Sequence, residues 1–486
     1  MIRKTLLLLT LTLLFNCTNE PKENIETEIA AIENGLLKSI QVESVDPDTY
    51  NILDRMKHHN VPGASIAVVR NGEIQWAKGY GFANTTLQTK VDQNTLFQAG
   101  SISKPVAALA ALKLVEEGKL DLDTDINNYL KTWKISENKF TTNVKVTLRR
   151  LLTHTAGMTV HGFPGYTQKD TFPSIESVLN GKGNTSAIMV DTIPGSIWRY
   201  SGGGYTVMEK AVEDVSGEPF EDYIANHVLS TMDMHNSTYD QPLTKNHHEN
   251  ASAAYYSDGK IIEGLWHNYP EQAAAGLWTT PTDLAKYCIE IQDILKGKEN
   301  GVLSNKMVSE MLKKDKNDWG LGPALRWESD SLIFGHGGKN AGFTNDMMAF
   351  ANKGDAIIVM TSADNGGRLI GEILRAASKY YNWGTHQAKT VEISEMTNDE
   401  LSRFKGKYLL DFKVPDIGDY FINVTIDSGK LHVLDPNNND ENVLTPLKNM
   451  NFIDLDKGDQ VEIKIEDGGI ISILWNGRYN FNKVEE

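Results

Sequence analysis

Two hairpin patterns lie far apart in this chain, and their placement limits the folds open to it. Residues 64–77 read as two β-strands joined by the turn Asn71-Gly72. A second hairpin pattern covers 345–361 and leads into a helical segment near 371–380. The long middle alternates helical patches with Gly- and Pro-rich loops. This order predicts an α/β fold, in which an antiparallel sheet is assembled from both ends and flanked by helices.

One helix of this fold is expected at its centre. Ser101 to Glu117 reads as a helix that ends at Gly118. Between Val106 and Val115 it is apolar on all sides, which is typical of a helix buried throughout. The start of this helix is therefore expected to lie inside the domain.

The pattern changes near residue 395. Residues 397–400 (Thr-Asn-Asp-Glu) form a capping box for a short helix, and only short alternating strands follow, with Gly-containing turns between them. Residues 395–486 therefore predict a separate, small all-β barrel or sandwich.

The N-terminus predicts export. Residues 1–17 combine a basic start with an apolar run too short to span a bilayer, which is typical of a signal peptide. The run ends at Cys17 in a pattern similar to a bacterial lipoprotein processing site, and a lipidated Cys17 would anchor the protein to a membrane. The alternative is a plain signal peptide with an incidental Cys17. Either way we expect an exported protein of the bacterial cell envelope or periplasm.

The remaining organisation follows from these limits. Residues 18–45 are expected to form a tether and a helix, because Ile25, Ile29, Ile32, Leu36 and Ile40 recur at helical spacing. The main domain is then 46–385, and the β-domain is 395–486. No pattern predicts the oligomeric state.

Charge and cysteine content exclude several classes of function. The net charge is −16, which argues against binding nucleic acid because phosphates require clustered cations. The two cysteines, Cys17 and Cys288, allow no disulfide framework and no cysteine-based metal site. We predict no metal and no cofactor, and a small-molecule or peptide substrate.

A Ser–Lys pair is the first candidate for chemistry. Ser101 and Lys104 are three residues apart, so they share one face of a helix. Serine needs a neighbouring base to become a nucleophile, and burial lowers the pKa of a lysine towards the neutral form that can serve. The alternative is a helix-capping serine beside an incidental lysine.

Two Gly-rich segments could complete such a site. In residues 199–205 (RYSGGGY), the Tyr200 phenol could relay a proton if a cation such as Lys104 depressed its pKa. In residues 334–339 (FGHGGK), small residues on a strand edge would let a substrate approach, and a backbone N–H there could form an oxyanion hole with that of Ser101.

Four short motifs occur in order along 46–385: SISK (101–104), LLTHTAGM (151–158), RYSGGGY (199–205) and GHGG (335–338). Together they resemble the serine β-lactamase-related family, which includes penicillin-binding carboxypeptidases, class C β-lactamases, esterases and D-amino-acid-directed peptidases. Residues 395–486 resemble the lipocalin-like domain of some members.

The resemblance implies roles for individual residues. Ser101 would be acylated while Lys104 and Tyr200 share its proton, and water would hydrolyse the acyl-enzyme. The strand motif would be His336, Gly337 and Gly338, followed by Lys339 as the second oxyanion N–H donor. Ser201 and Gly202 would be candidate substrate contacts, and His154 would support the site without taking part in the chemistry.

Two departures from the family pattern shape the expected activity. Gly202 replaces the Asn of Tyr-x-Asn, and His336-Gly337 replaces Lys-Thr, so groups that could hold a substrate amide and carboxylate are missing. We therefore expect a hydrolase of esters or peptide amides. The alternatives are a D,D-carboxypeptidase or β-lactamase, and a penicillin-binding sensor that does not turn over.

Overall fold

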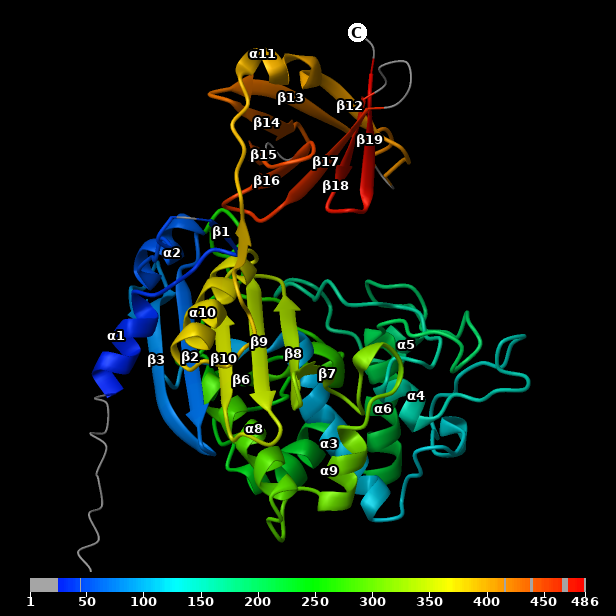
Figure 1. Cartoon of the computed structure of the whole chain (residues 1–486). Helices are drawn as coiled ribbons and strands as arrows, with labels where there is room; N and C mark the ends of the chain where they lie inside the picture. The colour runs from blue at the N-terminus through cyan, green and yellow to red at the C-terminus, as the bar shows by residue number, and fades with distance from the viewer. Residues whose placement is uncertain (1–24, 44, 415–416, 438–439, 466–470, 485–486) are drawn as a thin grey trace, which may run out of the picture.

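The computed structural model of the chain describes residues 25–43, 45–414, 417–437, 440–465 and 471–484. The predicted signal peptide and Cys17 lie outside these residues. No helix in the described ranges is long and apolar enough to cross a membrane. Figure 1 shows a large domain that contains a helix-covered sheet, and a smaller barrel placed beside it.

The sheet of the large domain has strands from both ends of the sequence at its centre. Among the described residues it has seven strands in the order β4-β3-β2-β10-β9-β8-β7, and every neighbouring pair is antiparallel. Strand β2 lies beside β10, with Val69 opposite Ala356. The predicted α/β fold and both hairpins are therefore confirmed. The strands are β2 (Gly63–Arg70), β3 (Glu73–Asn84), β4 (Thr89–Lys90), β7 (Ala324–Glu328), β8 (Ser331–Asn340), β9 (Phe343–Phe350) and β10 (Ala356–Thr361).

Helices cover both faces of this sheet (Figure 1). One face packs against α1 (Ile25–Glu33), α2 (Ile52–His58) and α10 (Gly367–Tyr380). The other face packs against a helical layer that contains α3 (Ser103–Glu116), α6 (Gly202–Ser216) and α8 (Pro281–Leu295). Shorter elements complete the layer: α4 (Leu148–Leu152), α5 (Ile175–Leu179), α7 (Phe220–Ile224), α9 (Asn305–Met311), β5 (Phe97–Gln98) and β6 (Trp278–Thr279).

The predicted central helix is present, but it begins differently. Residues Gly100–Ile102 form a 3₁₀ turn, η1, and the α-helix starts at Ser103. From Ser103 to Leu112 every residue of α3 is buried. Apolar side chains on all sides make this arrangement favourable, because each one removes its surface from water.

The edge of the sheet nearest this helix is only half paired. Strand β7 pairs with β8 from Ser331 to Gly335, and Ala324 is its last partner. Within the described chain no further strand pairs with β8 on that side, so residues 336–340 form an open edge. The open edge is the part that passes the 3₁₀ turn η1.

The C-terminal domain is a closed barrel, which is one of the two forms expected from the sequence, a barrel or a sandwich. Its strands pair in sequence order and the last pairs with the first. They are β12 (Gly406–Leu410), β13 (Phe421–Asp427), β14 (Lys430–Asp435), β15 (Asp440–Pro446), β16 (Asn451–Asp454), β17 (Gln460–Ile465), β18 (Ile471–Trp475) and β19 (Tyr479–Lys483). Alternating residues fill its interior, and one end is covered by α11 (Asn398–Leu401), which starts at the predicted capping box, and η8 (Ser402–Phe404).

The N-terminal segment differs from the expected single helix, because α1 ends at Glu33 and is followed by β1 (Ile40–Val42). Gly35 lies close behind the last turn of α1, because a Cβ there would lie 2.5 Å from the Ala31 carbonyl oxygen. Strand β1 pairs in parallel with β11 (Lys389–Val391), in the segment that leads to the barrel.

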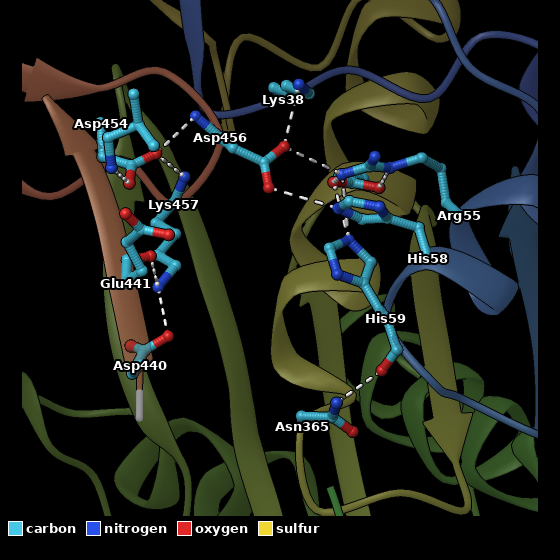
Figure 2. Close-up of polar contacts among 12 residues, drawn as sticks. Lys38, Arg55, His58, His59, Asn365, Asp440, Glu441, Asp454, Asp456 and Lys457 are labelled. Carbon is cyan, nitrogen blue, oxygen red and sulfur yellow. Dashed lines mark hydrogen bonds and ion pairs between the residues drawn. The ribbon is translucent and has the colours of Figure 1, made fainter. Parts of the chain in front are cut away.

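The two domains also meet through one turn of the barrel (Figure 2). Asp456, between β16 and β17, lies 2.9 Å from Lys38, 3.6 Å from Arg55 and 3.3 Å from His58 of the large domain. Partial burial raises the pKa of Asp456, but Lys38 and His58 outweigh it and hold this pKa well below its usual range. The turn is thus an electrostatic contact between the domains.

Candidate active site

Ser101 and Lys104 are in contact at the start of the buried helix. The Nζ atom of Lys104 lies 3.0 Å from Ser101 Oγ. Lys104 is 2% exposed, and burial lowers its pKa to about 7. At and above neutral pH a large share of this lysine is therefore uncharged, and its lone pair can accept the hydroxyl proton of Ser101.

A π-helix holds the lysine in this orientation. Segment η6 (Gln272–Gly276) packs against α3, and the carbonyl oxygen of Ala274 accepts a hydrogen bond from Lys104 Nζ at 2.7 Å. The segment is itself tied to α6, because Glu209 accepts a hydrogen bond from the Ala273 amide at 2.7 Å. π-Helices are rare and often occur at functional sites. With one N–H directed to Ala274, the lone pair of neutral Lys104 is free to face Ser101.

Tyr200 lies on the other side of the serine. The Nζ atom of Lys104 is 5.0 Å from its ring centroid, and the phenolic oxygen lies within hydrogen-bonding reach of the Ser101 side chain. Burial raises the pKa of Tyr200, and the bond to Ser101 opposes this only partly. The depressed pKa considered from the sequence is therefore not found. Tyr200 stays protonated and acts as a hydrogen-bond donor.

His336 brings the strand into contact with this tyrosine. Its Nε2 atom lies 3.4 Å from the Tyr200 hydroxyl, and Nδ1 lies 2.5 Å from the Gly337 carbonyl oxygen. A carbonyl can only accept, so Nδ1 carries the proton and Nε2 is the acceptor. Burial, and then the charge of Lys104, lower the pKa of His336 to about 3. The strand therefore offers a neutral imidazole at the position where the pattern drawn from the resemblance has a lysine in many members.

His154 supports the tyrosine from behind. The ring of His154 lies 4.2 Å from the ring of Tyr200, and its Nδ1 accepts the Ser201 amide at 3.1 Å. Burial lowers its pKa well below the usual value, so the ring is neutral. Trp319 and His161 also contact Tyr200, at 5.8 and 5.0 Å between ring centroids. His154 thus orients the 199–201 backbone and the phenol, in the supporting place expected for it.

Glycines let the open strand edge approach the nucleophile. A Cβ on Gly338 would lie 1.9 Å from the Ala99 carbonyl oxygen, and one on Gly100 would lie 2.5 Å from the Lys339 amide nitrogen. Gly100 also has a φ of +56°, which favours glycine. The Lys339 amide is thereby brought beside the turn that holds Ser101, where a second oxyanion donor is required.

The side chain of Lys339 has a different use. Its Nζ donates to the Asp364 carbonyl at 2.6 Å and lies 3.7 Å from the Asp364 carboxylate. These contacts direct its charge to the segment after β10. Gly337 is exposed and has open space around it, since a Cβ there would meet nothing nearer than 3.9 Å.

Ser201 and Gly202 are occupied by the protein itself. The hydroxyl of Ser201 donates to the Thr159 carbonyl at 2.7 Å and accepts the Gly204 amide, so it caps α6. A Cβ on Gly202 would lie 2.9 Å from the Phe163 ring and 3.2 Å from the His161 carbonyl oxygen. The 161–163 loop thus fills the space that an Asn side chain would need.

Comparison with known families agrees with this geometry. A family model described as Beta-lactamase matches residues 51–378, which is more than half of the chain. The protein therefore belongs to the β-lactamase family, and the resemblance drawn from its motifs is confirmed. Among the described residues, no group of three His, Cys, Asp or Glu side chains is placed to hold a metal ion.

Curated relatives share the same region. "Protein flp" of Staphylococcus aureus (strain MW2) is 28% identical over 240 residues, which cover 49% of this chain and 46% of that protein. The chain thus spans about half the length of the Flp proteins that it matches. The "Putative penicillin-binding protein PbpX" of Bacillus subtilis (strain 168) is 27% identical over 338 residues, or 68% of this chain and 78% of that one.

Solved structures show the same fold. A penicillin-binding protein homologue from Pyrococcus abyssi, described as octameric, aligns with a TM-score of 0.61 at 20% identity and covers 89% of this chain and 98% of its own. The D-amino acid amidase from Ochrobactrum anthropi SV3 aligns with a TM-score of 0.54 at 20% identity and covers 68% and 97%. The first alignment is too long to involve the large domain alone, so the barrel contributes to it.

The structure adds site residues that the sequence did not reveal. The Ala274 carbonyl acts through the backbone of a π-helix, and no side-chain pattern marks it. Trp319 reaches Tyr200 from a segment between α9 and β7, and only the tertiary fold places it there. The chemistry-bearing side chains Ser101, Lys104, Tyr200 and His336 are brought together as expected.

Proposed function

We propose that the protein is an exported serine hydrolase that forms an acyl-enzyme at Ser101 and acts on esters or small peptide amides. The observation that carries this proposal is the contact of Ser101 with a buried Lys104 whose pKa is about 7. Export, and anchoring through a lipidated Cys17, are part of the proposal and rest on the N-terminal pattern.

The reaction follows from the hydrogen bonds of the site. Neutral Lys104 takes the Ser101 proton as Oγ attacks the acyl carbon, and the amides of Ser101 and Lys339 receive the oxyanion. The proton then passes to the leaving group, aided by the protonated Tyr200, and the acyl-enzyme forms. Water attacks the ester by the same route and releases the acid, which restores Ser101.

The binding groups favour esters and small amides over β-lactams. His336 is neutral, Lys339 is directed to Asp364, and the 161–163 loop covers Gly202. A β-lactam carboxylate and amide side chain therefore lose one charge-assisted bond and one neutral one. That loss corresponds to about 2–4 kcal/mol, or roughly 30- to 1000-fold in affinity.

Covalent labelling tests the nucleophile. A fluorophosphonate probe should add one label to the wild-type chain by intact-protein mass, and none to Ser101→Ala. Ser196→Ala, at an exposed serine, is the control and should label fully. Undiminished labelling of Ser101→Ala would refute the assignment.

Substrate comparison tests the proposed class. We expect kcat/KM for p-nitrophenyl butyrate to exceed that for nitrocefin and for a D-Ala-D-Ala peptide at pH 7.5. A clear preference for nitrocefin would instead indicate a β-lactamase. A single burst without turnover on every substrate would indicate a sensor.

A further inference from the structure

The barrel contains a cavity that the hydrolase site does not use. It has a volume of about 560 Å³ and lies at the end of the barrel opposite α11 and η8. The end that α11 and η8 cover is filled by three fully buried side chains, Leu401, Phe404 and Tyr408. The strands close into a barrel, so the cavity is closed at the covered end and open at the other. We call this cavity the cup and its open end the mouth.

The wall of the cup is apolar and aromatic. Ile422 and Val433 are buried in it, and Phe481 lies beside them. Trp475 and Tyr479 lie nearer the mouth. The other apolar and aromatic lining residues are Leu410, Phe412, Val414 and Tyr420. Such a wall binds a hydrocarbon or aromatic body, because the ligand removes apolar surface from water on both sides.

The mouth is acidic. Asp435 receives the hydroxyl of Tyr420, and Asp459 receives the amides of Asn442 and Asn476 at 2.7 and 2.8 Å. All these donors are neutral. In the described part of the chain no salt bridge joins either carboxylate to a cation, so no cation partner offsets them at the rim.

The other charges of the rim do not cancel these two. Asp440 forms an ion pair with Lys457, which also donates to the Glu441 carbonyl at 2.7 Å (Figure 2). Arg478 is exposed, with its guanidinium 5.0 Å from the Tyr479 ring centroid, and it supplies one positive charge. The remaining balance at the mouth is negative.

We propose that this cup binds an amphipathic organic cation, with its apolar body inside the barrel and its positive group at the mouth. Carboxylates attract the cation, and the faces of Tyr420, Trp475 and Tyr479 can contact it as well. A fatty acid or an anionic product of the hydrolase would meet Asp435 and Asp459 at the same place. The proposal does not depend on the chemistry at Ser101.

Two probes that differ in the sign of the head group test the proposal. Decyltrimethylammonium and decanoate have the same chain length and can be titrated into the full-length protein by calorimetry, below their micelle concentrations. We expect one cation per chain, with a Kd at least about tenfold lower than that of decanoate, and weaker cation binding at higher salt. Absence of cation binding, or equal or tighter binding of decanoate, would overturn the proposal.

Three variants locate the probe. Asp435→Asn should weaken cation binding by roughly fivefold, the effect of removing one nearby charge. Asp427→Asn, at the covered end of the barrel, is the matched control and should change nothing. Ile422→Trp should fill the cup and abolish binding. If circular dichroism shows that Ile422→Trp does not fold, the comparison of Asp435→Asn with Asp427→Asn decides where the probe binds. Equal changes of the cation Kd in these two variants would place the probe outside the cup and overturn the proposal.

Discussion

Replacing Lys104 by methionine should make the protein inactive and more stable, and the gain should depend on pH. Burial moves the lysine pKa from 10.5 to about 7 in the folded state. Below pH 7 both states bind the proton, and the folded state carries the full cost of a buried charge. That cost is 3.5 pKa units at about 1.36 kcal/mol each, or about 5 kcal/mol.

The pH range of the effect follows from the sign of the shift. Between pH 7 and 10.5 the unfolded chain holds one more proton than the folded one, so wild-type stability rises by about 1.4 kcal/mol per pH unit. Lys104→Met lacks this group, so its advantage over wild type should shrink by that amount per unit. For a domain of about 340 residues this equals roughly 2 °C per pH unit in the difference of Tm.

Calorimetry of wild type and Lys104→Met from pH 7 to 9.5 measures this difference in Tm. The effects of all other titrating groups are the same in both proteins and cancel in the difference. Kinetics provide the second readout, because kcat/KM of wild type should rise through pH 7 as Lys104 loses its proton and then level off. A Tm difference that does not change with pH, together with a rate that does not fall below pH 7, would show that Lys104 is not a buried base of lowered pKa.

Three further predictions test the surroundings. Gly338→Ala should reduce activity by at least about 100-fold, because its Cβ would collide with the Ala99 carbonyl and displace an oxyanion donor, whereas Gly337→Ala has room and should stay active in the same ester assay. Tyr200→Phe should lower kcat by about 10²–10⁴-fold with an unchanged circular dichroism spectrum, and a wild-type rate would exclude its role as proton donor. Asp456→Asn should speed proteolysis between residues 384 and 400 by up to about fivefold, as expected for loss of ~1 kcal/mol at a partly exposed ion pair; no change would mean that the apolar contacts alone hold the barrel.

Local patterns predicted the parts of the structure that local physics controls. The Asn71-Gly72 turn fixes a hairpin through its backbone preferences, and the spacing of Ser101 and Lys104 survives although Ser101 lies in a 3₁₀ turn. The capping box at Thr397 likewise forms as expected.

Features that depend on long-range packing could not be predicted from local sequence patterns. From the sequence, Tyr200 could relay a proton only if a cation such as Lys104 depressed its pKa. Burial instead raises that pKa, and Trp319 and His154 pack on the ring from distant segments. Ile40 matched a helical spacing, yet it forms a strand because residues 389–391 offer it a partner. Neither partner can be recognised from the residues next to it.

The pairing of β1 with β11 has a consequence for where this protein can be cut. The family match begins at residue 51, so a chain trimmed to that limit would keep Ser101 and all of the sheet. It would lose Ile40, which packs with Val391 and Ile453 between the domains, and Lys38, which contacts Asp456. The segment around residues 38–42 thus also helps to hold the barrel against the large domain. Trimming it would leave the barrel attached through the chain connection and through the contacts of Asp456 with Arg55 and His58 alone, and the catalytic sequence would give no sign of the loss.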